Sequence, residues 1–168
     1  MMSVNSILAK LPKNVEVCRL FVNLRVINSI NPIDEILNRI NRDNRNNQKN
    51  KNMEEELKSR TKLLAADVWM KCNNISNDIY DYKRQLIRCS SSVGANYRAA
   101  CRAKSKADFL NKLKIVEEEL DETMFFIELI LILKPDLENE FNKVYSEAEE
   151  LLKIMVKSIG TVRKSINK

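Results

Sequence analysis

Apolar residues recur every three or four positions in four stretches of the chain, a spacing that places them on one face of an α-helix. In the first stretch these positions are Leu64, Val68, Cys72, Ile75, Ile79 and Tyr82. In the second they are Leu86, Ser90, Val93, Tyr97 and Ala100. In the third they are Phe109, Leu113, Val116, Leu120, Met124, Ile127 and Leu131. In the fourth they are Phe141, Val144, Ala148, Leu151, Met155, Ile159, Val162 and Ile166. The pattern predicts four amphipathic helices.

Local signals mark where the predicted helices begin and end. Ser105-Lys-Ala-Asp108 has the form of a capping box, so the third helix is expected to begin there. Lys134-Pro135-Asp136 is expected to end it, because proline disfavours helical geometry in the preceding residue. The connections are short, so neighbouring helices must run antiparallel. The predicted fold class is all-α, an antiparallel up-down-up-down four-helix bundle over residues 53–168.

The first 52 residues differ from the rest of the chain. They hold twelve Asn and two of the three Pro, and residues 41–52 are all polar. Such a run buries too little apolar surface to offset the entropy of ordering it, so residues 1–52 are predicted to be a weakly structured leader and linker, a poorly ordered N-terminal extension. Within this segment, residues 15–30 fit either a short helix or a strand, and residues 33–40 fit one or two helical turns.

Met53 is followed by three Glu, which would stabilise the N-terminal end of a helix. This resembles a natural protein start. We hypothesise that residues 1–52 are upstream sequence translated in frame. A full-length mass of 19.5 kDa for protein from the native host would contradict the hypothesis.

Composition supports a single folded helical domain. The 168 residues include only two Gly and three Pro, too few for the many turns of an all-β fold. The four cysteines form no CxxC pair, which argues against a metal site and a disulfide framework. The beginning of the chain lacks the features of a secretory signal, and the longest apolar stretch is about half the length of a membrane span. We expect a cytoplasmic protein with reduced thiols and no membrane partner.

The residues needed for common catalytic mechanisms are missing. The chain has no histidine, which excludes Ser-His and Cys-His nucleophiles and removes the commonest metal ligand. It also has no glycine-rich phosphate loop. The acidic run of residues 117–122 circles its helix, so we interpret it as a solvated face and not as a metal site. We therefore expect no enzymatic activity, no catalytic residues, no cofactor and no bound metal.

The net charge of +6 is unevenly distributed. Residues 1–52 hold nine Lys and Arg against four Asp and Glu, so residues 53–168 carry only +1. Within that part, residues 83–114 hold nine basic residues against Asp108 alone, and residues 115–150 hold twelve acidic residues against two basic ones. Two interpretations of these blocks stay open. In the first interpretation, the basic and acidic blocks pair across helices and between subunits. In the second, the basic block binds phosphates.

The second interpretation gives a candidate site at the corner between the second and third helices, where basic residues crowd beside Tyr97. The candidate nucleic-acid-binding residues are Arg88, Arg98, Arg102, Lys104, Lys106 and Lys112. The candidate subunit-interface residues on the acidic block are Glu117, Glu118, Glu119, Asp121 and Glu122.

Four motifs in residues 85–130 allow a family to be identified. They are Ser92-Val-Gly-Ala-Asn96, Arg98-Ala-Ala-Cys-Arg102, Ser105-Lys-Ala-Asp-Phe109, and Val116-Glu-Glu-Glu119 with Asp121-Glu122. In these motifs the chain closely resembles the 23S rRNA intervening-sequence protein family, and the resemblance covers roughly residues 60–166. It is also similar, more distantly, to the accessory variability determinant of diversity-generating retroelements. Residues 1–52 have no counterpart in this resemblance.

The resemblance implies a four-helix bundle that assembles into a homopentameric ring. It further implies partners among nucleic acids, RNA or DNA, or a protein such as a reverse transcriptase. We expect a homo-oligomeric bundle that binds nucleic acid weakly through its basic corner. The alternative is an oligomeric scaffold whose charge blocks serve self-assembly and binding of a protein partner.

Three residues allow more than one role. Gly94 is expected at a close helix contact, because glycine inside a helix costs about 1 kcal/mol that packing can offset. Asn96 is interpreted first as a buried residue that fixes helix register and second as a site residue. Trp69, the single tryptophan, is expected in the core or at an interface and not as a surface for base stacking.

Overall fold

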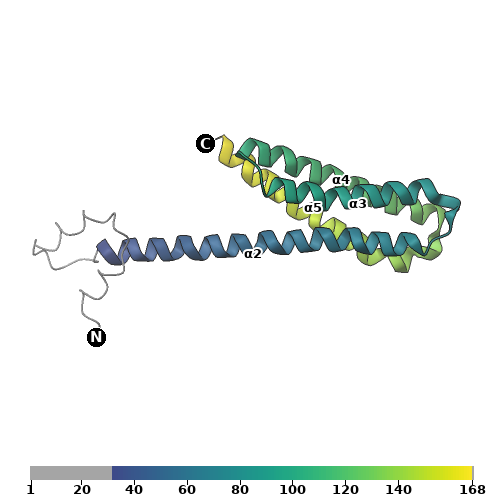
Figure 1. Ribbon diagram of the computed structural model, residues 1–168, viewed down its shortest axis with the longest axis horizontal. Helices are drawn as coiled ribbons and strands as arrows, with labels where there is room; N and C mark the ends of the chain where they lie inside the picture. The colour runs from purple at the N-terminus through teal and green to yellow at the C-terminus, as the bar shows by residue number, and fades with distance from the viewer. Residues whose placement is uncertain (1–31, 168) are drawn as a thin grey trace, which may run out of the picture. The chain divides into compact units, whose positions relative to one another are not determined.

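The computed structural model describes residues 32–167, which form four α-helices and two short 3-10 helices without a strand (Figure 1). The α-helices are α2 (Pro32–Asn73), α3 (Tyr80–Ala100), α4 (Lys106–Leu133) and α5 (Glu138–Ile166). The 3-10 helices are η2 (Asn77–Ile79) and η3 (Pro135–Leu137). The predicted all-α four-helix bundle is confirmed. The predictions for residues 1–31 lie outside the described residues.

The bundle lies within residues 46–168, which form one compact unit of the chain. In the bundle α3 packs on α4 and α4 on α5. Arg60 on α2 bonds Glu147 on α5, with 2.7 Å between Nε and Oε1, so α2 also borders α5. Thr61 on α2 lies next to Gly94 on α3. Each helix therefore packs beside its neighbours in the chain, and α2 and α5 close the bundle.

The connection between α2 and α3 begins earlier than the apolar pattern predicts. α2 ends at Asn73, so the prediction that one helix continues to Tyr82 is wrong. The Lys83 ammonium is buried and donates to the Ile75 carbonyl at 2.7 Å. This carbonyl lies beyond the end of α2, so the bond gives it the partner that the helix does not supply. Ile75 and Ile79 remain buried beneath this turn. The apolar spacing thus continues through a segment that is not α-helical.

The α3–α4 corner has the predicted capping box. The Ser105 hydroxyl accepts from the Asp108 N–H at 3.1 Å, and α4 begins at the next residue, Lys106. The Asp108 carboxylate accepts from the Lys104 N–H at 3.0 Å, one residue before the cap. At the other end α4 stops at Leu133, two residues before Pro135, as expected.

The core is continuous along the bundle, and most predicted apolar positions are buried in it. The exceptions lie on α4 and at the ends. On α4, Thr123 and Ile130 are buried, whereas the predicted Met124 and Leu131 are only half-buried. The segment from residue 124 to 133 is apolar on every side, so its spacing does not fix which face turns inward. Tyr82 and Ile166, also predicted in the core, are exposed.

The N-terminal half of α2 is helical where the sequence predicts a weakly structured linker. Residues 35–53 are exposed, and residues 41–52 nevertheless continue the helix. The run contains neither Gly nor Pro, and extending an existing helix adds one backbone hydrogen bond for each residue fixed. Side chains add local bonds, such as Gln48 Nε2 to Asn52 Oδ1 at 2.9 Å. The division of the chain at residue 52 stays a prediction.

Candidate nucleic-acid interface

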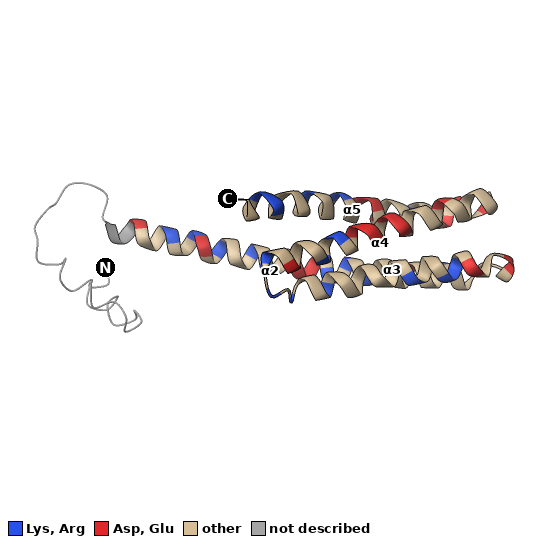
Figure 2. Cartoon of the chain, turned by 90° about the horizontal axis from the view of Figure 1, so that it is seen from above, with Lys and Arg blue, Asp and Glu red and all other residues tan. Residues whose placement is uncertain are grey.

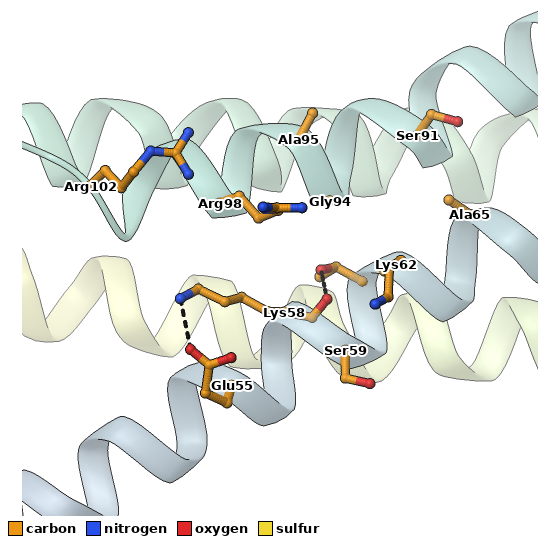
Figure 3. A pocket seen from close by; sticks show the side chains of 11 residues that line it. Glu55, Lys58, Ser59, Lys62, Ala65, Ser91, Gly94, Ala95, Arg98 and Arg102 are labelled. Carbon is orange, nitrogen blue, oxygen red and sulfur yellow. Dashed lines mark hydrogen bonds and ion pairs between the residues drawn. The ribbon is translucent and has the colours of Figure 1, made fainter.

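A groove of about 650 Å³ lies between α2 and α3 on the surface of the bundle (Figure 3). Lys58 and Lys62 come from α2, Arg98 comes from α3, and Arg102 lies in the turn that follows the end of α3 at Ala100. Lys58 and Lys62 are four residues apart, so both lie on the same face of α2, about 6 Å apart along its axis. The antiparallel arrangement brings the two lysines and the two arginines to the same stretch of groove.

Three of these four cations are available to an anion. Lys58 is paired with Glu54 and with Glu55, whose Oε1 lies 2.9 Å from Lys58 Nζ, and these carboxylates raise the pKa of Lys58. Within residues 32–167, Lys62, Arg98 and Arg102 make no ion pair. The groove lining includes four cations and one carboxylate, so it carries a net charge of +3. Such a surface attracts phosphates.

The floor of the groove is made of small residues. Ala65, Ser91, Gly94 and Ala95 lie along it. A Cβ placed on Gly94 would lie 3.4 Å from the Thr61 carbonyl oxygen, an ordinary contact distance. The backbones of α2 and α3 therefore approach closely here, as expected for Gly94, and no large side chain fills the space above them.

The other candidate cations lie outside this groove. Lys104 and Lys106 are at the α3–α4 corner, and Lys106 Nζ donates to the Ser165 carbonyl on α5 at 3.4 Å. Lys112 on α4 pairs with Asp108 at 3.5 Å. Arg88 is on α3 but reaches α4, where it pairs with Glu122 and, at 3.8 Å, with Glu119. The structure therefore brings only Arg98 and Arg102 of the six candidates together with the α2 lysines.

The acidic candidates lie on α4, where Figure 2 shows a group of acidic residues, and they divide in the same way. Glu119 and Glu122 pair with Arg88 of the same chain, so for this part of the acidic block the charges pair between helices. Burial raises the pKa of Glu119, and Arg88 opposes that effect. Glu117, Glu118 and Asp121 make no ion pair with any residue from 32 to 167.

Two side chains differ in part from the sequence interpretation. Trp69 is 54% exposed, so the core alternative is wrong, and the interface alternative stays a prediction. Asn96 is half-buried, and its amide donates to the Ser92 carbonyl of its own helix at 3.0 Å. This bond is local, so it does not set the register between helices.

The α2 half of the groove was not identified from the sequence. Lys58 and Lys62 precede the basic block and sit in a segment whose charges are mixed. The available signal was the spacing of Lys58 and Lys62, because cations at i and i+4 share one face of a helix, and that face can lie opposite Arg98 on the neighbouring helix. Recognising it requires knowing where α2 meets α3.

The core protects two of the three described thiols. Cys72, Cys89 and Cys101 are free, and the first two are buried. Burial raises the pKa of Cys72 to about 11 and also raises the pKa of Cys89. Because the thiolate is the reactive form, these two residues are structural.

Comparison with known proteins gives consistent results. The family described as 23S rRNA-intervening sequence protein matches residues 47–157, which include every residue of the groove. A solved structure of unknown function from the S23 ribosomal protein family of Bacteroides thetaiotaomicron is 27% identical. It matches with a TM-score of 0.57 over 61% of this chain and 97% of its own. Among curated proteins, none matches this chain.

Neither the family description nor the description of the solved structure indicates an enzyme. Of the helices within residues 32–167, none is both long enough and apolar enough to cross a membrane.

Proposed function

Because the chain belongs to the 23S rRNA-intervening sequence protein family, we propose that it is a non-enzymatic, cytoplasmic bundle that binds RNA or DNA phosphates. The binding surface is the α2–α3 groove. One observation carries this proposal: Lys62, Arg98 and Arg102 line one groove and make no ion pair with other residues of the described chain. An anion that binds a paired cation must displace the carboxylate, and that costs free energy. The unpaired cations therefore bind an external anion more favourably.

The affinity is expected to be modest and dependent on salt. Residues 53–168 carry only +1, so long-range attraction is weak and binding depends on the few cations in the groove. If about three phosphates are neutralised, log affinity should fall with log salt concentration with a slope of about −2 for a single strand.

The test compares charge reversals in the full chain. Lys62→Glu with Arg98→Glu should abolish binding of a fluorescent RNA oligonucleotide, measured by anisotropy between about 50 and 200 mM NaCl. Lys157→Glu with Lys164→Glu is the matched control, since both residues are exposed on α5 and away from the groove. Equal losses in the two variants, or no RNA binding by the unaltered chain at low salt, would reject the proposal.

The bundle is further proposed to act as a homo-oligomer, a homopentamer by its family resemblance. Glu117, Glu118 and Asp121 on α4 offer a subunit surface, because their charges are not used by ion pairs with the described residues. An asymmetric contact between unlike surfaces closes into a ring when the rotation fits. Light scattering coupled to size exclusion should give a mass near five times 19.5 kDa. A monomer mass at micromolar concentration would contradict this.

The second candidate function is an oligomeric scaffold for a protein partner such as a reverse transcriptase. It is favoured by the pairing of Arg88 with Glu119 and Glu122, since this cation of the basic block is used in ion pairs within the chain and not left for phosphates. The groove variants distinguish the two functions. If Lys62→Glu with Arg98→Glu dissociates the oligomer, the groove is a subunit contact and the scaffold function is supported.

A further inference from the structure

The face of the bundle that carries the cationic groove continues toward the other end of α2 and α3. A second hollow of about 440 Å³ is lined there by Trp69 from α2 and by Tyr80, Arg84 and Ile87 from α3. Trp69 and Tyr80 are 54% and 58% exposed. Two large aromatic side chains therefore stand half in solvent beside a cation, outside the core to which their size would usually assign them.

Helix geometry places the two hollows in line. Lys62 and Trp69 are seven residues apart, about two turns and 10.5 Å, so they share one face of α2. On α3, Arg98, Ser91 and Arg84 are also spaced by seven. Ala65 and Ser91 line the first hollow, and the residues one turn further along each helix, Trp69 and Ile87, line the second. From Lys58 to Asn73 the line extends about 22 Å.

The kind of side chain changes from one end of this line to the other. At one end are the cations Lys62, Arg98 and Arg102, and small residues follow in the middle. At the other end are Trp69 and Tyr80, with Arg84 63% exposed and 3.8 Å from Asp81. A ligand that fits this line needs phosphates to contact the cations and flat rings to contact the exposed aromatic side chains. Unpaired nucleotides supply both, since their bases are free to stack while their backbone follows a positive groove.

We infer that the α2–α3 face binds single-stranded nucleic acid, with the backbone on the cations and a base stacked on Trp69. This rests on the proposed function and adds the form of the ligand to it. A duplex is disfavoured because its bases are already stacked, so Trp69 and Tyr80 would have no base faces to contact.

Trp69 itself reports the contact, because it is the only tryptophan in the chain. In the full-length protein, a single-stranded oligoadenylate should quench tryptophan emission as it saturates. Inorganic polyphosphate, which has phosphates and no bases, should bind without quenching. A self-complementary RNA duplex of the same length should bind more weakly than the single strand. Quenching by polyphosphate, or a duplex that binds as tightly as the single strand, would overturn the inference.

Substitution separates this inference from the proposed function. Trp69→Ala should weaken oligoadenylate binding about 5- to 150-fold, the range for losing one stacked base, and should leave polyphosphate affinity and the salt slope unchanged. Trp69→Phe should retain most of the affinity. Phe125→Ala is the matched control, since Phe125 is 56% exposed on α4 and lines neither hollow.

The outcomes are distinguishable. If Trp69→Ala binds oligoadenylate as the unaltered chain does, while Lys62→Glu with Arg98→Glu abolishes binding, the stacking inference fails and phosphate binding stands. If neither oligoadenylate nor polyphosphate binds at low salt, the proposed function fails, and the inference fails with it. If Trp69→Ala instead dissociates the oligomer, the aromatic hollow is a subunit contact and the inference is overturned.

Discussion

At the residue scale, ionisation of the Glu119 carboxyl group lowers the stability of the folded chain. Its Oε2 atom is buried and finds no hydrogen-bond donor among the described residues. Arg88 lies 3.8 Å away and is shared with Glu122. Burial raises the pKa of Glu119, and the folded chain therefore holds this proton more tightly than the unfolded chain does.

The sign of the resulting pH dependence follows directly. For an acid whose pKa is raised by folding, the stabilising contribution is present at low pH and is lost as pH rises above the unfolded value, about 4.3 for Glu. Glu119→Gln should therefore raise the melting temperature at pH 7 and give a smaller gain near pH 4. Thermal unfolding followed by circular dichroism at both values checks this. Glu56→Gln, at an exposed position on α2, is the control, and an equal gain at both pH values would contradict the explanation.

At the element scale, the pairing of α2 with α3 depends on small residues at the contact. Gly94 leaves room for a methyl group and little more, because its added Cβ would lie 3.4 Å from Thr61 O and 3.7 Å from Lys62 N. On α5, Gly160 has no such neighbour among the described atoms within 4 Å. The two glycines form a matched pair inside helices.

Alanine and leucine at these positions should behave differently. Gly94→Ala and Gly160→Ala should each stabilise the fold by up to about 1 kcal/mol, the helix-propensity difference. Gly94→Leu should destabilise it by about 1–3 kcal/mol, because the larger side chain forces the helices apart. Gly160→Leu should cause no such loss. Urea unfolding measures all four, and equal effects of the two leucine variants would show that α2 and α3 are not closely packed at Gly94.

The same scale shows what the sequence could and could not predict about the elements. The four helices and the start of α4 followed from apolar spacing and from the Ser105–Asp108 capping box, because both signals are local. The end of α2 did not. Ile75 keeps the apolar spacing while the Lys83 ammonium bonds its carbonyl, an interaction that depends on the folded chain. On α4 the uniformly apolar segment after Thr123 left the inward face undetermined.

At the scale of the whole molecule, the candidate site could be predicted only in part. Arg98 and Arg102 were identified because they lie in a dense basic block of the sequence. Lys58 and Lys62 lie beside them because α2 packs against α3. Trp69 is left exposed when α2 packs in this way. Arg88 was grouped with the site by its charge, but its partners are on α4. Charge in the sequence thus indicated the region, and tertiary structure selected its members.

The distribution of the core leads to a prediction for the whole chain. Every buried apolar residue that the structure describes lies between Leu57 and Ile159, within the unit of residues 46–168. Removing residues 1–45 should therefore leave helical unfolding cooperative, with a melting temperature within about 3 °C of that of the full chain, a change of about 1 kcal/mol or less.

Removing residues 1–62 is the matched comparison, since it deletes Leu57, Thr61 and the ion pair of Arg60 with Glu147. That deletion should lower stability by several kcal/mol, because losing buried apolar side chains costs about 2–5 kcal/mol each. Circular dichroism at 222 nm during heating follows both. If the shorter deletion destabilises the chain as much as the longer one, residues 1–45 contribute to the stability of the bundle and the boundary of the folded unit lies further toward the N-terminus.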